Sequence, residues 1–331
     1  MLGAWVGYKY VTMVKSNFWL FIVVILTGSL FSNVSFAQTG KKLRTIIVDA
    51  GHGGTDVGAV GQYENSLRSK EKDLTLAISK KLVVELKKQM PDINIVPTRT
   101  TDVYQNPREK ADIANQNKGD LFLCIHADSG PLKTSRRQIG SKNVKKYKIS
   151  YTGKGKRKKK ISTPYTVEEP IYEYFKLPIP RAGTSVWIFA AHKTSDKLKA
   201  IMKEEPEFEI EAGGADSSYN KFDFNTPAGR AIAQVYAKRF QEKSDLIATY
   251  VNEEVEKTGR AALGINQRQI GIWVLQATNM PAILIETGFI NNEEDERYLN
   301  SEKGQQELAI AVTKAVIRYR EVFEGIRTAT K

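Results

Sequence analysis

The chain has 331 residues, 41% of them hydrophobic, which is enough to bury one sizeable core, and its single cysteine, Cys124, excludes an intrachain disulfide. The formal net charge is +13, yet residues 133–160 alone hold 13 Lys or Arg and no Asp or Glu. The basic character therefore belongs to one segment, which excludes a domain that is basic throughout.

The first 37 residues have the features of a targeting segment. A largely apolar run of 14 residues, Phe18–Phe31, follows two lysines, and Ser35-Phe36-Ala37 then offers a small-x-small cleavage site. We predict a secretory signal peptide over residues 1–37, because the run is short for a membrane span; an uncleaved membrane anchor is the alternative. A start at Met13 gives the signal peptide an ordinary charged region, which favours that start. The residue directly after the cleavage site is Gln38 and not a cysteine that could carry a lipid, so we expect an exported chain with no stable membrane anchor.

Hydrophobic periodicity predicts alternating strands and helices in the first part of the mature chain. The predicted helix over Ser69–Met90 has an apolar residue at every fourth position from Leu74, the pattern of a helix that faces a core. Asn106-Pro107 has the chemistry of a helix start, and that helix runs to about Asn115. The predicted strands are Arg44–Asp49, Ile93–Thr98 and Leu121–Ala127. This alternation predicts an α/β fold with a mixed, mostly parallel twisted sheet.

The second part of the chain is less regular. Residues 130–182 combine the basic run with Gly, Ser, Pro and Tyr, and we predict an irregular insertion there. The chain turns acidic over residues 204–216, within a predicted acidic and helical insertion at about 200–245. The remaining predicted elements are strands over Thr184–Ala190, Ile272–Gln276 and Ala282–Glu286, and helices over roughly Pro227–Thr258 and over Glu302–Phe323. We predict one catalytic domain over residues 43–325 and no second domain.

Two of the three histidines end predicted strands. His52 lies in IIVDAGHGGTDVGAVG, with four glycines within eight residues, and His126 ends LFLCIHADS. The carboxyl ends of parallel strands share one edge of a sheet, so the two imidazoles should lie close together. Glu71 lies on the inward stripe of its helix, where a carboxylate is costly unless it meets a cation. Two imidazoles and one carboxylate are the ligands of a catalytic zinc with an open position for water.

Each of these residues also has a purely structural interpretation. His52 can simply order a turn, and His126 can be a hydrogen-bonded core histidine. Glu71 can favour the N-terminus of its helix electrostatically. The three together at one inferred edge of the sheet favour a metal site. The glycines around His52 would then leave room for a bulky substrate beside the metal.

Glu286 ends the apolar strand AILIE and is a candidate general base that takes a proton from water and passes it to a leaving group. The alternatives are a fourth metal ligand or a structural carboxylate. His192 has polar and charged neighbours, so we interpret it as a surface histidine. The acidic cluster that begins at Asn291-Asn292 is better explained as a helix N-cap followed by acids in the first turn.

The ordered set of motifs resembles the zinc-dependent N-acetylmuramoyl-L-alanine amidases of the type 3 amidase family. The resemblance covers roughly Leu43–Ser129 and Thr184–Tyr319. The motifs are VDAGHGGTDVGAVG, Glu71-Lys72-Asp73-Leu74, Thr98-Arg99, Arg108, Ala114-Asn115, IHADS and MPAILIETGFINN.

The resemblance implies a mixed sheet with helices on both faces. It also implies that Zn²⁺ is bound by His52, Glu71 and His126, and that Glu286 is the catalytic acid. The implied substrate is peptidoglycan, cut at the amide bond between N-acetylmuramic acid and L-alanine, for cell-wall remodelling or daughter-cell separation. A zinc peptidase acting on the stem peptides and a non-catalytic wall-binding protein are the alternatives.

The sequence departs from the family pattern in several places. Asp128 stands where the family commonly has Asn, and the 130–182 segment is longer than the usual connection. Some cell-division members carry an inserted helix that covers the zinc until a partner removes it. The stretch 204–216 and the helix after it fall in that interval, so an activator protein that displaces this insertion is a predicted partner. A solvated acidic loop is the interpretation that the sequence favours for residues 204–216 themselves.

The basic segment 133–160 has three interpretations. Tyr147 and Tyr151 lie within the charge run, as in some nucleic-acid-binding segments, but predicted export argues against nucleic acid as a partner. We favour a solvated loop that meets an anionic envelope surface over an inert insertion. The lack of a wall-binding repeat and of a lipid anchor favours the periplasm as the location.

Overall fold

The computed structural model describes residues 41–189, 194–203, 226–267 and 272–326. Six strands form one sheet in the order β2-β1-β3-β8-β6-β7. Their bounds are β1 Thr45–Ala50, β2 Asn94–Pro97, β3 Leu121–Asp128, β6 Thr184–Ile188, β7 Ala262–Gln267 and β8 Ala282–Phe289. All neighbouring pairs are parallel except β6 and β8, which are antiparallel. The predicted mixed, mostly parallel sheet is confirmed.

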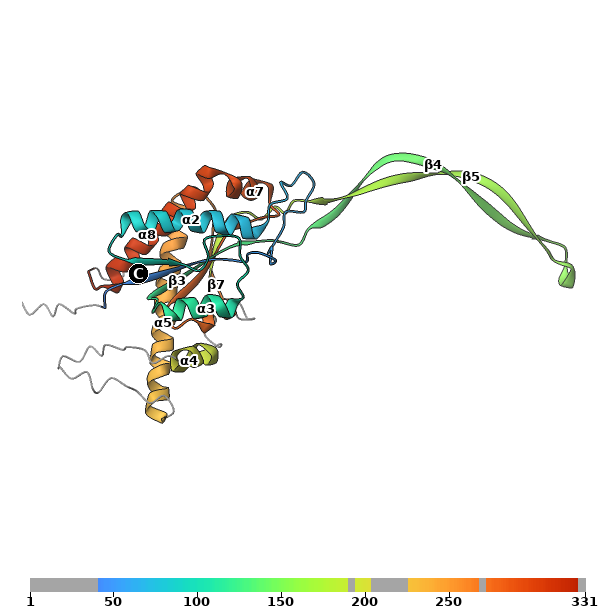
Figure 1. Ribbon diagram of the computed structural model, residues 1–331. Helices are drawn as coiled ribbons and strands as arrows, with labels where there is room; N and C mark the ends of the chain where they lie inside the picture. Colours follow the sequence, from blue (N-terminus) through green and yellow to red (C-terminus); the bar gives the residue numbers. More distant parts are fainter. Residues whose placement is uncertain (1–40, 190–193, 204–225, 268–271, 327–331) are drawn as a thin grey trace, which may run out of the picture.

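Helices cover both faces of this sheet (Figure 1). Alternate residues of a strand face opposite sides. On β1, Ile46 and Val48 pack into a cluster with α2, α5 and α8, whereas Ile47 packs into a second cluster with α3 and α6. The bounds of these helices are α2 Glu71–Gln89, α3 Pro107–Gln116, α5 Pro227–Glu256, α6 Trp273–Ala277 and α8 Glu302–Phe323. The central strands β1, β3 and β8 are therefore buried on both faces, as their continuous apolar sequences indicate.

Local signals in the sequence account for the helices that position the site. The apolar stripe of α2 is fully buried, from Leu74 to Met90. Asn106 caps α3 in a capping box, in which its side chain accepts from the Glu109 N–H and the Glu109 carboxylate accepts from the Asn106 N–H. Asn292 caps α7 (Glu293–Asn300) by accepting from the Asp295 N–H, so the N-cap interpretation of that cluster is confirmed.

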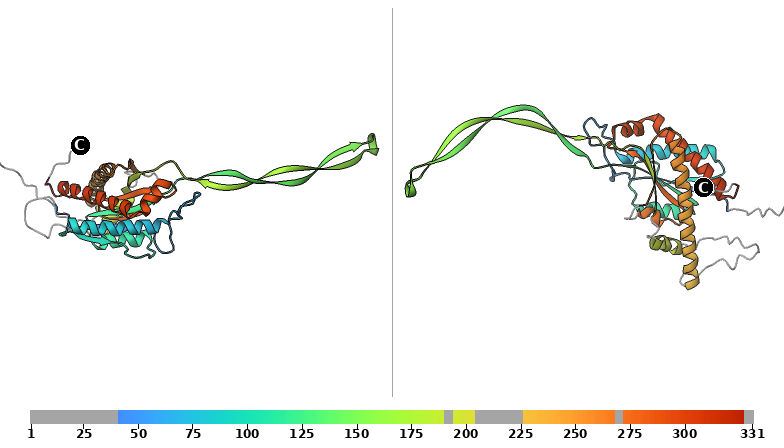
Figure 2. Two further views of the ribbon diagram at one scale, coloured as in Figure 1. Left: turned by 90° about the horizontal axis from the view of Figure 1, so that it is seen from above. Right: turned by 180° about the vertical axis from the view of Figure 1, so that it is seen from behind.

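The expectation that regular structure stops over residues 130–182 is wrong. Strands β4 (Lys133–Thr152) and β5 (Lys159–Leu177) form a long antiparallel hairpin, joined by a turn that contains a short 3-10 helix, Gly155–Arg157. The hairpin leaves the domain as an extended, twisted ribbon (Figure 2). Both of its faces are largely exposed, and the short alternation of Tyr147, Ile149 and Tyr151 lies within a lysine-rich run that is typical of a solvated loop.

Two further elements differ from the prediction. The stretch Ile272–Gln276 was expected as a strand, but it forms the short helix α6, because a five-residue apolar run carries no distinct period. The edge strand β7 and the helix α4 (Thr194–Lys203) were not predicted. The segment predicted as a signal peptide, His192 and the acidic stretch 204–216 lie outside the described residues. None of the described helices is both long enough and apolar enough to span a membrane.

Candidate metal centre

His52 lies in the turn that follows β1. Its backbone φ is 57°, in the left-handed region that non-glycine residues rarely adopt. The Gly51 N–H donates to the Ile125 carbonyl of β3 at 2.9 Å, which ties the end of β1 to the neighbouring strand. The turn therefore presents the imidazole at the carboxyl edge of the sheet.

Glu71 begins α2 and is 5% exposed. Its Oε1 lies 2.8 Å from Nδ1 of His126, and its Oε2 lies 3.1 Å from Nε2 of His52. Two backbone groups donate to the same carboxylate, the Ala59 N–H at 2.8 Å and the Ala127 N–H at 3.0 Å. The N-terminus of the helix thus holds the carboxylate between the two imidazoles.

His126 lies near the end of β3, where the register with β8 shifts before Asp128. Its ring centroid is 4.9 Å from that of His52, with the two rings at 77°. One donor atom each from His52, Glu71 and His126 lies within 4.8 Å of the others. The structure therefore brings the three residues that the sequence suggested as ligands into one group. This donor set fits a zinc ion with a fourth position open for water.

The glycines near His52 have a different role from the one expected. A Cβ on Gly51 would lie 2.6 Å from Nε2 of His126, and a Cβ on Gly58 would lie 2.5 Å from Oε2 of Glu71. These positions leave room for the candidate ligands themselves, not for a substrate.

Asp49, Cys124 and His126 form a second group with donor atoms in metal-binding range. Asp49 already contacts the Lys110 ammonium at 3.0 Å and accepts from the Cys124 thiol at 2.9 Å. Burial raises the pKa of the Cys124 thiol well above its usual value. A protonated thiol is a poor metal ligand, and the charge of the Asp49 carboxylate is already balanced by the Lys110 ammonium. The group around Glu71 is therefore the better candidate.

Asp56 was missed by the sequence analysis. Its Oδ2 lies 2.8 Å from Nδ1 of His52, on the side of the ring away from Glu71. A carboxylate on the second ring nitrogen fixes the tautomer and orientation of a metal-binding histidine. The signal in the sequence was its spacing of four residues from His52, within the turn that the glycines create.

Glu286 lies on β8 directly beside His126 on β3, because the two residues are register partners on adjacent parallel strands. Partners in register point to the same face of a sheet, about 5 Å apart. Glu286 is 7% exposed. The candidate base is therefore next to one candidate ligand, and it comes from a strand that provides none of the three.

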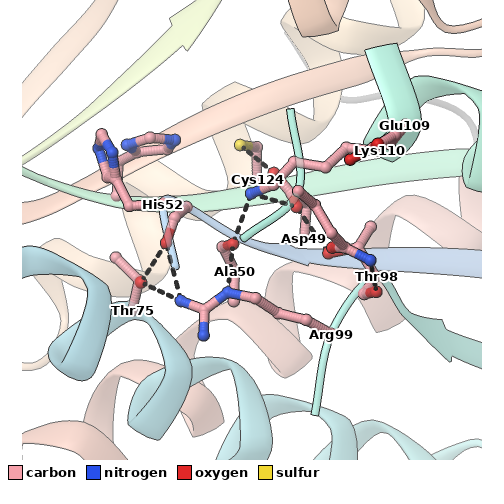
Figure 3. A network of polar contacts seen from close by, with 12 residues as sticks. Asp49, Ala50, His52, Thr75, Thr98, Arg99, Glu109, Lys110 and Cys124 are labelled. Carbon is pink, nitrogen blue, oxygen red and sulfur yellow. Dashed lines mark hydrogen bonds and ion pairs between the residues drawn. The ribbon is translucent and has the colours of Figure 1, made fainter. Parts of the chain in front are cut away.

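Buried cations hold the end of β1 in place (Figure 3). Arg99 donates to the carbonyls of Ala50 at 3.1 Å and Gly51 at 2.9 Å. Lys110 donates to the Ala50 carbonyl at 2.6 Å and pairs with Asp49. These two side chains, neither of which the sequence analysis assigned a role, fix the backbone immediately before His52.

The electrostatics of the metal-free group are those of a carboxylate between imidazoles. Burial alone would raise the pKa of Glu71, but hydrogen bonds and charge from His126 and His52 hold it far below its usual range. Burial likewise opposes the charged form of His52, yet Glu71 and then Asp56 raise its pKa above the usual value. The fixed negative charge of Glu71 makes this position one that attracts a cation.

The fold and the site together define an α/β protein with a candidate metal centre at the carboxyl ends of its strands. The chain belongs to the N-acetylmuramoyl-L-alanine amidase family, because the family model with that description matches residues 46–318.

Curated relatives and a solved structure agree with this membership. The chain is 24% identical over 297 residues to the probable N-acetylmuramoyl-L-alanine amidase AmiB of Haemophilus influenzae, a match that covers 89% of this chain and 56% of the relative. It is 25% identical over 297 residues to the amidase AmiA of Salmonella typhimurium, a match that covers 89% of this chain and 82% of the relative. The chain thus spans about half the length of the first relative. Its fold is similar to that of Cwp6 from Clostridium difficile, with a TM-score of 0.50 at 19% identity, covering 83% of this chain and 29% of that chain.

Proposed function

We propose that this protein hydrolyses the amide bond between N-acetylmuramic acid and L-alanine in peptidoglycan. The observation that carries the proposal is the group of His52, Glu71 and His126 within 4.8 Å of one another, in a chain of this amidase family. We further propose zinc as the metal, since two imidazoles and a carboxylate are typical of open zinc sites. When bound there, zinc would polarise the scissile carbonyl and lower the pKa of a water molecule.

The protein's own residues have distinct roles in this proposal. His52, Glu71 and His126 hold the metal, and Asp56 keeps the His52 ring in the required orientation. The Glu286 carboxylate accepts a proton from the attacking water and returns it to the departing alanine nitrogen. Its place beside His126 supports this role, because a base must lie next to the water that it deprotonates.

Glu286→Gln tests the proposal with little change in side-chain volume. The expected result is loss of turnover on purified sacculi with zinc content unchanged, whereas His126→Ala should lose both zinc and turnover. Hydrolysis retained in Glu286→Gln would refute the role of this residue. Analysis of the released fragments separates the alternatives. An amidase releases intact stem peptides from the glycan, a peptidase releases shortened stems, and a wall-binding protein releases nothing.

Export to the periplasm and an activator protein are part of the same proposal. The predicted signal peptide supports export. The acidic stretch 204–216 supports an inhibitory insertion, since a carboxylate is a suitable occupant of an open metal position. Replacing its glutamates by glutamine should raise turnover of the purified chain if the stretch inhibits, and unchanged turnover would contradict the inhibitory role.

A further inference from the structure

The hairpin of β4 and β5, residues 133–177, is here called the arm. It starts five residues after β3 ends, and is therefore rooted at the edge of the sheet that bears the candidate metal centre. At its root, the Glu64 N–H donates to the Lys176 carbonyl at 2.8 Å, and Arg137 pairs with Glu64 at 2.7 Å. The arm then extends away from the domain (Figures 1 and 2).

The arm is long and continuously paired. Its ladder runs from Lys133 opposite Leu177 to Thr152 opposite Lys159, with one irregularity between Gln138 and Gly140. At about 3.3 Å per residue, the 20 residues of β4 span roughly 60 Å. The tip of the arm can therefore contact a surface that lies far from the candidate metal centre.

Charge is segregated along the arm. Its acidic residues lie toward the root, where Glu173 contacts Arg137 at 2.7 Å and Glu169 contacts Lys146 at 2.8 Å. Residues 142–167, here called the outer arm, contain ten Lys or Arg and no Asp or Glu, and six of these cations fall within residues 154–160. The positive charge thus increases from the root to the tip.

Apolar and aromatic side chains alternate with this charge. Tyr147, Ile149 and Tyr151 share one face of the outer arm at 61%, 51% and 65% exposure. Ile161 and Tyr165 lie on the opposite face at 45% and 49% exposure. Tyrosines and aliphatic residues among lysines are typical of protein surfaces that lie at the headgroup level of a bilayer.

We propose that the outer arm binds a bilayer surface rich in anionic headgroups. Clusters of four to eight Lys or Arg bind such surfaces through the negative surface potential. The length of the arm favours a separate surface as the ligand of its tip. A substrate bound at the metal centre would gain nothing from positive charge that lies about 60 Å away. Lysines on both strands also disfavour pairing of the exposed edges with another strand. The arm would then hold the catalytic domain at a fixed distance from a membrane.

The test measures sedimentation of the chain that begins at Gln38 with phosphatidylcholine vesicles, with and without phosphatidylglycerol. The tip variant replaces four lysines by glutamine, and the control variant removes the same charge from exposed positions of α2 and α8. The tip positions are Lys154, Lys156, Lys158 and Lys160, and the control positions are Lys80, Lys87, Lys88 and Lys314.

We expect the tip variant to bind anionic vesicles roughly 100- to 1,000-fold more weakly at low salt, at about fivefold per lysine. The control variant should bind like the parent, and all three proteins should bind neutral vesicles weakly. Tyr147→Ser with Tyr151→Ser should reduce the part of the binding that survives high salt. Circular dichroism checks that each variant is folded.

Two results would overturn the proposal. One is a tip variant that binds anionic vesicles as tightly as the parent. The other is a tip variant that loses binding to purified sacculi but keeps binding to vesicles, which would assign the outer arm to an anionic wall polymer instead. Hydrolysis of soluble wall fragments should be the same in parent and tip variant. Vesicle binding is measured without any hydrolysis, so its result remains interpretable even if the protein proves to have no amidase activity.

Discussion

Replacing Gly51 by alanine is the sharpest available test of how the candidate metal centre is built. The backbone of Gly51 is not in the left-handed region, so alanine is allowed there by its φ angle. Its Cβ, however, would lie 2.6 Å from Cε1 and Nε2 of His126 and 2.8 Å from the Ile125 carbonyl oxygen. The imidazole must move to relieve the first two contacts, and the contact with the Ile125 carbonyl also requires a small shift of the backbone.

The expected losses of stability and of zinc affinity distinguish an effect on the metal site from an effect on the fold. Overpacking costs about 1–3 kcal/mol, and alanine recovers about 0.4–1 kcal/mol by restricting the unfolded chain, so the metal-free protein should lose at most about 2.6 kcal/mol of unfolding free energy. A misoriented ligand typically weakens metal binding by about 10- to 100-fold. We therefore expect zinc affinity to fall by that factor in Gly51→Ala.

Competition titration with a chromogenic chelator measures zinc affinity, and urea denaturation of the metal-free chain measures stability. Two glycines serve as controls. A Cβ on Gly119 would lie 2.5 Å from Sδ of Met280, away from the site, so Gly119→Ala should lose stability with unchanged zinc affinity. Gly140 has no atom within 4 Å of its would-be Cβ, so Gly140→Ala should leave zinc affinity unchanged and raise stability by about 0.4–1 kcal/mol through the unfolded chain alone. Parental zinc affinity in Gly51→Ala, or an equal loss in Gly119→Ala, would refute this account of the site.

Three further predictions concern side chains outside the ligand set. Asp56→Ala should weaken zinc binding about 10- to 100-fold in the same titration, with little change in urea stability because Asp56 is nearly half exposed. Burial opposes ionisation of Asp49, but Lys110 and hydrogen bonds from Cys124 and Thr98 lower its pKa below the usual 3.8. Its contribution to stability is therefore complete above that value and lost as the pH falls through the folded pKa. Urea midpoints measured from neutral to about pH 3 should drop in the parent, and Asp49→Asn should be less stable with a smaller drop. The fully buried Lys197 amine donates to the carbonyls of Leu275 at 3.0 Å and Met280 at 2.6 Å. Lys197→Met should cost about 3 kcal/mol in urea denaturation, and equal stability of this variant and the exposed Lys199→Met would contradict that role.

The elements that the sequence predicts well are those with one buried face. The helix α2 repeats an apolar residue every fourth position from Leu74, and the structure buries each of them. The arm was missed because neither of its faces is buried, and because its alternating Tyr147, Ile149 and Tyr151 lie among lysines, a composition typical of a solvated loop. Edge strand β7 was missed for a related reason, since all of its residues are at least partly exposed. Periodicity reports a buried face, and segments without a fully buried face show it only weakly.

The sequence predicts those residues of the candidate site that lie at the ends of regular strands or helices. His52, His126 and Glu286 follow or end apolar runs whose carboxyl ends share one edge of a parallel sheet. Asp56 follows no such rule, because an exposed acid in a glycine-rich turn is common. The roles of Arg99 and Lys110 depend on contacts between segments about 50 or 60 residues apart, which no local pattern contains.

The three candidate ligands are not held equally, and the difference indicates how the site is organised. Glu71 accepts from two backbone N–H groups, and His52 is held on its far side by Asp56. The His126 ring contacts Glu71 through Nδ1 and packs against Gly51. The backbone donors fix the carboxylate, and the carboxylate in turn orients both imidazoles. Glu71 is thus the element around which the site is formed, which explains why a buried acid stands at the start of α2 and why the nearest glycines lack the side chains that would displace it.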